Sequence, residues 1–470
     1  MPFLNRRTFG RHIFLTVAAV LWGGKIHARG VSEQKLISEN SKADLIKNIL
    51  EYGALGDGHT DCTKAIQNAI DDVHKSGGGT VRIPAGYFVY SDIIFVKDRV
   101  NLHALDGAVL TPNTQRQSIT VTGRNVTLRG LNIFSNANSR ITDSTGNAIT
   151  VTETRNVCVE NCVINGAWAA GIFIRSTTNF LVQGNTIAKT QADSIHVTGG
   201  SSEGTVKNNI CIEGGDDGVA VVSYRRQNTV CNNIQIIANQ ISGGKARGVA
   251  VVGGENIQIL LNNIVDTKWA GIYVASEESF DTYGSHNIII KNNRLHHVNR
   301  VSDGGTHGCI TVIGRPGSAI AVQGTVSLQN QFISLISNLI FGDGRDGIRI
   351  NEYCSDVLVQ ENSIESTGGW GIACAAFDVQ ILKNKITAPA VGGIALGATC
   401  PGGTMQVDEN SITLQKPSLI GIVLRSSRVE EVFVRHNFIY VSGTMVNAIR
   451  NEIPLARVRF DENIIRTNSD

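Results

Sequence analysis

Three aspartates lie close together in the sequence, and their spacing is the clearest sign of chemistry in the chain. Asp193 comes two residues before the apolar Ile195, and Asp217 comes two residues before the apolar Val219, with Asp216 beside it. The two apolar positions are 24 residues apart. If that interval is one turn of a coil, the aspartates lie on neighbouring turns. Three acids so close would share protons, bind a cation or carry out acid–base chemistry.

The chain has the repeat that such a coil requires. From about residue 125 the pattern apolar-x-x-Asn-x-apolar recurs, with intervals from 22 residues (Asn362 to Asn384) to 45 residues (Asn293 to Asn338). A period of this length is typical of solenoid proteins. Alternating apolar and β-branched positions indicate that each unit consists of short strands. The sequence therefore predicts an all-β solenoid of a dozen or more turns.

Eleven asparagines occupy the fixed position of this repeat. We expect them to stack inside one corner of the coil, with each side-chain amide bonded to the next. This role is structural, and we assign these residues no chemistry. They are Asn185, Asn209, Asn239, Asn262, Asn293, Asn338, Asn362, Asn384, Asn410, Asn437 and Asn463.

The segment that precedes the repeat has a distinctive motif. Residues 52–58 read YGALGDG, a helical pattern of apolar residues follows behind Thr60 or Asp61 as N-cap, and residues 80–87 read TVRIPAGY. This block resembles the amino-terminal signature of the pectate-lyase-like β-helix superfamily. The resemblance implies a single-stranded right-handed parallel β-helix, with the short helix as its amino-terminal cap. A cap protects the apolar interior and the strand edges of the first turn.

A second strand in each repeat begins with Gly or Asp, and it defines a column of residues along the coil. Two residues before the first inward apolar position, the column reads Asp193, Asp217 and Arg247 on consecutive turns. The residue after that apolar position points outward over the same surface. We therefore predict that the substrate-binding residues beside the acids are Arg175, His196, Arg247 and Tyr273.

The acidic segment also resembles a family of enzymes. Residues 192–197 (ADSIHV) and 215–221 (GDDGVAV) are similar to the NTDG-I and GDD-x-I-A-I motifs of the polygalacturonase-type glycoside hydrolases. That resemblance implies inverting hydrolysis, in which one acid protonates the leaving oxygen and the others hold the attacking water. Carried over by position, Asp217 is the acid, and Asp193 and Asp216 are the base pair.

The resemblance ends at the next two turns. Ala246-Arg247-Gly248 stands where the family has GHG, and Tyr273-Val274-Ala275 stands where it has RIK for the substrate carboxylate. Galacturonan is therefore not implied as the substrate. We also expect Arg247 to form a salt bridge that would keep Asp217 ionised.

Two later segments resemble the missing pieces. Residues 305–308 contain His307, and residues 346–350 contain Asp346 and Arg349. They lie three and four turns beyond Asp217, roughly 14–19 Å away by strand spacing. Together with Asp303 they are an alternative, second site.

Composition gives little support for other function classes. A net charge of +2 on 470 residues offers no argument for nucleic acid or an anionic membrane as a partner. The nine cysteines form no CxxC pair. We expect Cys162, Cys211 and Cys374 to be small buried side chains, and we predict no metal site and no cofactor.

The first 28 residues have the features of an export signal. Arg6 and Arg7 precede an apolar run, residues 13–22, that is too short for a permanent membrane span, and residues 26–28 (IHA) offer a small-residue cleavage site. The segment resembles a twin-arginine signal peptide. This implies export by the twin-arginine translocase to the periplasm or beyond, with no stable membrane span afterwards.

The expected organisation follows from these assignments. Residues 29–46 are a polar lead segment, and residues 47–470 are the β-helix domain. Long excursions near 275–287 and 296–330 interrupt the repeat, and residues 313–327 within the second read as loop or lid material. Long loops of a solenoid gather on one side and wall a groove.

Three functions are consistent with these features. The first is an exported carbohydrate-active protein that hydrolyses a polysaccharide at Asp193, Asp216 and Asp217. The second is a non-catalytic polysaccharide-binding or envelope-structural solenoid, since the whole chain also resembles the twin-arginine-translocated repetitive proteins of bacteria, which bring no established activity. The third is a uronic-acid lyase or epimerase, against which stands the lack of a Lys or Arg base with a calcium-binding acid cluster on one turn.

Overall fold

The chain folds as a right-handed parallel β-helix of about 15 turns, as the repeat predicts. The computed structural model describes residues 45–300, 307–315, 329–342, 344–397, 403–425, 429–443 and 448–468. The predicted signal peptide, residues 1–28, and all but the end of the lead segment lie outside the described residues. No helix among the described residues is long and apolar enough to cross a membrane.

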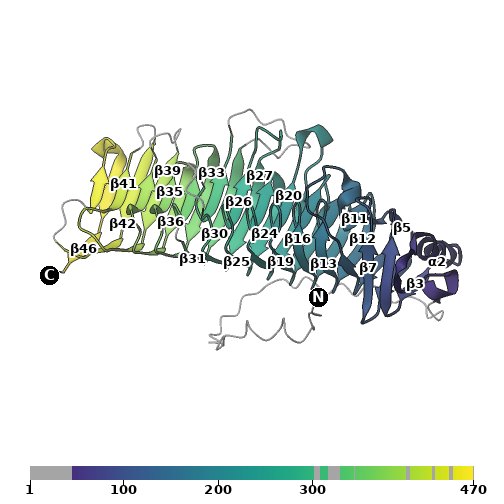
Figure 1. The fold of residues 1–470 in the computed structure, drawn as a ribbon. Coiled ribbons are helices and arrows are strands. Elements are labelled where there is room, and N and C mark those ends of the chain that lie inside the picture. Colours follow the sequence, from purple (N-terminus) through teal and green to yellow (C-terminus); the bar gives the residue numbers. More distant parts are fainter. Residues whose placement is uncertain are drawn as a thin grey trace, which may run out of the picture. The chain divides into compact units, whose positions relative to one another are not determined.

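Three parallel sheets run along the helix, and each rung, meaning one circuit of the chain, contributes one strand to each sheet, except that the first and last described rungs have no strand in sheet 3 (Figure 1). Sheets 1 and 2 have 16 strands each, and sheet 3 has 14. Each strand pairs with the equivalent strand of the next rung. Sheet 1 runs from β1 (Ile46–Asn48) to β45 (Val458–Asp461), sheet 2 from β2 (Asp57–Asp61) to β46 (Ile464–Thr467), and sheet 3 from β5 (Ile94–Val96) to β44 (Ile449–Asn451).

Helix α2 (Thr63–Lys75) packs beside the first strands of the β-helix, next to β3 (Gly79–Ile83) (Figure 1). Its buried face carries apolar residues at helical spacing, as predicted, among them Ile66 and Ile70. The N-cap is Cys62 rather than Thr60 or Asp61, because the helix begins at Thr63. The carboxylate of Asp61 still accepts the backbone N–H of Thr63, at 2.9 Å.

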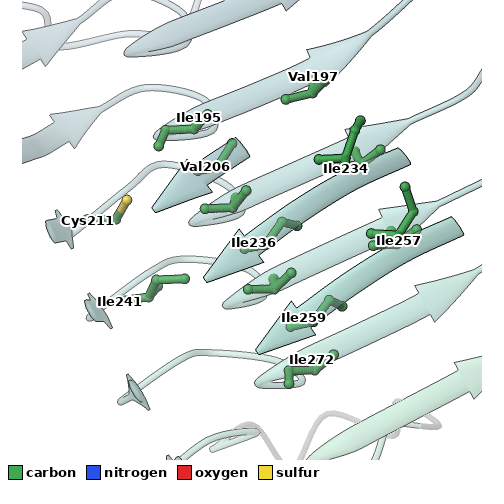
Figure 2. Packing of buried hydrophobic residues seen from close by; sticks show 14 of the residues in the cluster. Ile195, Val197, Val206, Cys211, Ile234, Ile236, Ile241, Ile257, Ile259 and Ile272 are labelled. Carbon is green, nitrogen blue, oxygen red and sulfur yellow. The ribbon is translucent and has the colours of Figure 1, made fainter. Parts of the chain in front are cut away.

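The inward side chains of the three sheets stack in apolar columns (Figure 2). In sheet 3 one column consists of Ile195, Val219, Val249 and Ile272, all fully buried and in register. Burial of each such side chain contributes about 1.5–3 kcal/mol, so the interior fixes which residues of the strands face outward. The strands concerned are β17 (Ile195–Thr198), β20 (Val219–Val222), β23 (Val249–Val252) and β26 (Ile272–Ala275).

The asparagine ladder is present as predicted. The side-chain amide of Asn185 donates to Oδ1 of Asn209 at 2.9 Å, and the backbone N–H of Asn185 donates to the same oxygen at 3.0 Å. This pair of bonds repeats at every step up to Asn463. Each buried amide is therefore satisfied within the structure, which agrees with a structural role.

The cysteines are also buried, as expected for small apolar side chains. The eight that the structure describes, including Cys162, Cys211 and Cys374, are buried and form no disulfide. Cys400 lies outside the described residues.

Candidate active site

The structure brings the three aspartates of the acidic segment together. One carboxylate oxygen from each of Asp193, Asp216 and Asp217 lies within 4.8 Å of the others. Asp193 and Asp217 are buried, and Asp216 is partly exposed. Three carboxylates at this distance can share a proton, hold a water molecule or ligate a hard cation.

Backbone hydrogen bonds between rungs set this arrangement. Oδ1 of Asp193 accepts the N–H of Asp217 at 2.9 Å, and Oδ1 of Asp217 accepts the N–H of Arg247 at 2.9 Å. Gly218 permits the close stacking, because a Cβ there would lie 2.6 Å from the carbonyl oxygen of Gly248. Each aspartate thus has a structural role and leaves its second oxygen for other contacts.

The second oxygen of Asp193 contacts His196. Nδ1 of His196 lies 2.6 Å from Oδ2 of Asp193, and the imidazole stacks on the ring of Phe173 with centroids 5.2 Å apart. Phe173 and His196 face outward in register on β14 (Ile172–Arg175) and β17. Both oxygens of Asp193 are therefore engaged, and the orientation of its carboxylate is fixed.

Asp217 has the unusual electrostatics of the site. Burial raises its pKa to about 8, and the neighbouring carboxylates of Asp193 and Asp216 act in the same direction, against the attraction of Arg247. Burial therefore favours the protonated form of this carboxyl group. A proton donor of this kind is what a general acid requires.

Arg247 forms the salt bridge with Asp217 that the sequence predicts, but burial outweighs its attraction and raises the pKa of the acid. Its Nη1 lies 3.5 Å from Oδ1 of Asp217, whereas its Nη2 forms a shorter ion pair with Glu277. Glu277 shares the positive charge, and the burial of Asp217 outweighs the remaining attraction. The guanidinium carbon also lies 4.4 Å from the ring centre of Tyr273 and 5.2 Å from that of Trp269.

A loop after β26 completes this side of the site. Glu277 lies in it, and Thr282 forms an antiparallel bridge with Tyr224. Apolar side chains on the outward faces of β20 and β23, such as Val222 and Ala250, are buried in one cluster with Tyr273, and Tyr224 packs against it. This loop corresponds to the excursion near 275–287, which ends where β27 (Ser285–Lys291) begins.

Asp216 is held by a residue that the repeat does not predict. Nη1 of Arg140 lies 2.6 Å from Oδ2 of Asp216. Arg140 belongs to the segment between β10 (Asn132–Phe134) and η2 (Ser144–Gly146), and Gln191 anchors that segment by donating to the carbonyl of Ala137 at 3.0 Å. A basic residue in a non-repeating loop carries no positional signal, so only the structure reveals the pair.

Arg175 is not brought to the acids by any contact in the described part of the chain. It lies at the end of β14, and its Nη2 is 3.6 Å from Oε1 of Glu153. Tyr273 and Arg247, in contrast, are in direct contact beside Asp217.

The residues of the alternative second site are distributed differently from the prediction. Asp303 lies outside the described residues, as does most of 313–327. The ring of His307 stacks on Tyr273 with centroids 5.0 Å apart, so it extends the aromatic surface beside Arg247. Asp346 instead pairs with Arg349, with Oδ2 and Nη1 2.8 Å apart.

Comparisons with protein families agree with the fold. Residues 46–272 match the family model described as rhamnogalacturonase A/epimerase, pectate lyase-like, and residues 283–439 match the model of the right-handed β-helix region. The superfamily predicted from the amino-terminal motif is therefore confirmed.

Solved structures of other proteins share the fold at low sequence identity. The catalytic unit of the GH87 α-1,3-glucanase from Streptomyces thermodiastaticus has a TM-score of 0.63 and 19% identity, covering 76% of this chain and 66% of that one. PfbA, a surface adhesin of Streptococcus pneumoniae, has a TM-score of 0.57 and 17% identity, covering 73% of this chain and 92% of that one. The family 28 exopolygalacturonase of Yersinia enterocolitica has a TM-score of 0.52 and 14% identity, covering 91% of this chain and 78% of that one. These likenesses concern the fold alone.

Curated proteins match over short segments. Alginate lyase 7 and mannuronan C5-epimerase AlgE3 of Azotobacter vinelandii are each 58% identical over 41 residues, which is 9% of this chain. The match spans 5% of the lyase and 2% of the epimerase. Plasmin and fibronectin-binding protein A of S. pneumoniae is 32% identical over 87 residues, 18% of this chain and 12% of that protein.

Proposed function

We propose that this chain, a right-handed parallel β-helix of the pectate-lyase-like kind, hydrolyses a glycosidic bond of a polysaccharide with Asp217 as general acid. The observation that carries the proposal is the cluster itself: the buried carboxyl group of Asp217, whose pKa burial raises, has an oxygen within 4.8 Å of an oxygen of each of two further carboxylates. Two of the solved structures with this fold are named as a glucanase and an exopolygalacturonase, which supports polysaccharide as the substrate.

The three aspartates have different roles in the proposed reaction. Asp217 gives its proton to the glycosidic oxygen as the bond from that oxygen to the anomeric carbon breaks. Asp193 and Asp216 hold a water molecule, whose oxygen bonds to the anomeric carbon and whose proton passes to one of the two carboxylates. To complete the cycle, the protonated base carboxyl releases its proton to solvent and Asp217 takes one up, so the net reaction adds one water across the glycosidic bond.

Water, rather than a carboxylate, is the nucleophile in this scheme. Separations near 5 Å are typical of retaining glycosidases and about 6.5–9.5 Å of inverting ones, and the carboxylates here lie within 4.8 Å. However, hydrogen bonds engage both oxygens of Asp193, and Arg140 neutralises Asp216. Both contacts weaken direct attack by a carboxylate, so we propose single displacement by a water that touches both groups.

The test is a screen of the protein against acidic and neutral polysaccharides. New reducing ends are expected with at least one polymer, and they should disappear in Asp217→Asn but not in the control Asp266→Asn, whose carboxylate faces Nη1 of Arg300 at 3.9 Å rather than the three acids. Products that absorb as unsaturated sugars would instead identify a lyase. Binding without either product, unchanged in Asp217→Asn, would identify a non-catalytic solenoid.

We also propose that the protein is exported by the twin-arginine translocase and acts in the periplasm or outside the cell. Support comes from Arg6, Arg7 and the short apolar run that follows them. In a bacterial host with this translocase, the wild-type chain is expected in the periplasmic fraction or the medium. The double variant Arg6→Lys/Arg7→Lys should remain in the cytoplasm, and equal export of both would contradict the proposal.

A further inference from the structure

We propose that Arg349, Trp370 and Arg425 form a second recognition site on sheet 3, which binds a carboxylated sugar unit of the polysaccharide. The inference rests on the proposed function, because it names the class of polymer that the same protein would bind. It is carried by contacts remote from the three acids.

Asp346 organises this site in the same way as Asp193 organises the first. Oδ1 of Asp346 accepts the backbone N–H of Trp370 at 2.8 Å, and its Oδ2 accepts from Nη1 of Arg349 at 2.8 Å. The Asp346 side chain is only 7% exposed, whereas that of Arg349 is 42% exposed. The acid is thus covered, and the cation that it orients faces solvent.

The indole of Trp370 lies over the next rung. A Cβ at Gly392 would lie 2.3 Å from Cζ3 of the indole, so this glycine makes room for the ring. The outward residues of the same two rungs are the small Ala373 and Ala395, in register on β35 (Trp370–Cys374) and β38 (Gly392–Leu396). The indole of Trp370 therefore has small side chains around it on these two rungs, and it remains partly exposed.

Arg425 adds a second cation beside the ring. It follows β41 (Ile420–Leu424), and its guanidinium carbon lies 5.7 Å from the ring centre of Trp370. It is exposed and has no ion pair among the residues that the structure describes. Because Asp346 offsets only Arg349, the site has a net positive charge.

These groups together favour a carboxylated sugar over a neutral one. A guanidinium group presents a planar fork of donors that matches a carboxylate, and stacking on an aromatic ring holds the fork in place. The indole offers an apolar surface for the C–H face of a sugar ring. A neutral sugar could use the indole but would leave the cations without a partner.

The distance between the two sites indicates a polymeric ligand. Arg349 and Trp370 lie on β32 (Ile348–Ile350) and β35, four and five rungs from β20, which follows Asp217. At about 4.8 Å per rung, these steps amount to roughly 19 and 24 Å. Only a chain of several sugar units along sheet 3 would contact both sites.

The test measures equilibrium binding in the Asp217→Asn background, where turnover is blocked. The probes are alginate and polygalacturonate, each compared with its carboxyl-reduced form. The parent is expected to bind at least one carboxylated polymer more tightly than the reduced form. Arg349→Ala/Arg425→Ala should weaken that binding about tenfold or more and leave the reduced form unaffected. Arg294→Ala is the matched control, since Arg294 stacks on Phe341 in sheet 2.

Two further results decide the inference. Trp370→Ala keeps the backbone N–H that Asp346 accepts and should weaken binding of both polymer forms. Equal affinity of the double variant and the parent, or equal affinity of the parent for both forms, would overturn the proposal. Because the assay needs no turnover, failure of the hydrolase proposal would appear separately, as an absence of new reducing ends with the wild-type chain.

Discussion

Arg247 lies beside Asp217 but directs its shorter ion pair to Glu277, so the buried acid is only partly compensated. This relationship reconciles two features that otherwise conflict, a guanidinium group 3.5 Å from a carboxylate and a carboxyl pKa raised by burial to about 8. We therefore expect the loop that contributes Glu277 to act on the protonation of Asp217 through a cation that it partly neutralises.

The first prediction concerns the pH dependence of activity. Since Asp217 must be protonated to act as an acid, kcat/KM should fall as pH rises through about 8. In Glu277→Gln, Arg247 would turn its full charge on Asp217 and lower its pKa, so the alkaline fall should move to lower pH. The pH–rate profiles of both proteins check this, and coincident profiles would show that Glu277 does not act on Asp217.

The second prediction concerns His196. Its Nδ1 holds Oδ2 of Asp193, so His196→Ala should free that carboxylate and lower kcat by about 10²-fold while the fold remains intact. A smaller change is expected in KM, because the contact orients the base rather than the sugar. Steady-state kinetics with circular dichroism separates this outcome from unfolding, and an unchanged kcat would remove His196 from the site.

The third prediction is stereochemical. Because both oxygens of Asp193 are engaged and Asp216 is paired with Arg140, the first sugar product should have inverted anomeric configuration. Proton NMR of the product at early times distinguishes the anomers. Retention would identify a carboxylate as the nucleophile, in keeping with the short separation of the three groups.

The sequence predicts the repeating part of the molecule well for a physical reason. A side-chain period of two and a fixed corner residue are local properties, so they place Asn185 and its equivalents, and they put Asp193 and Asp217 on adjacent rungs. Arg140 and Glu277 belong to loops without a period. Their positions depend on loop packing against distant rungs, which no local pattern encodes.

The lack of any local pattern for loop contacts also explains why the sequence does not predict the ion pairs of Arg247 and Arg175 with glutamates. The column of residues correctly places Arg247 next to Asp217, yet it cannot show that Glu277 competes for the guanidinium group. It likewise cannot show that Arg175 pairs with Glu153. Protonation and pairing depend on burial and on all neighbours, whereas a one-dimensional register gives only the neighbours within a sheet.

The fourth prediction tests the asparagine ladder. Oδ1 of Asn262 accepts from both the backbone and the side chain of Asn239, and its own amide donates to Oδ1 of Asn293 and to the carbonyl of Ile236. Asn262→Ala leaves several buried groups unpaired and should lower the free energy of unfolding by about 3 kcal/mol or more. Asn463→Ala, at the partly exposed end, should cost less, as urea unfolding would show.

The last prediction concerns stability against pH near the carboxyl-terminal rungs. Burial of Asp408 opposes ionisation, but bonds with His436 and Gln406 keep its pKa below the ordinary 3.8, and the same contact raises the pKa of His436 above 6.5. Stability from Asp408 is present above pH 3.8 and declines as pH falls through its lowered pKa. Stability from His436 is complete below pH 6.5 and declines as pH rises through its raised pKa. The thermal midpoint of His436→Asn relative to wild type should therefore show the largest deficit between these limits, and a deficit that does not vary with pH would contradict the assignment.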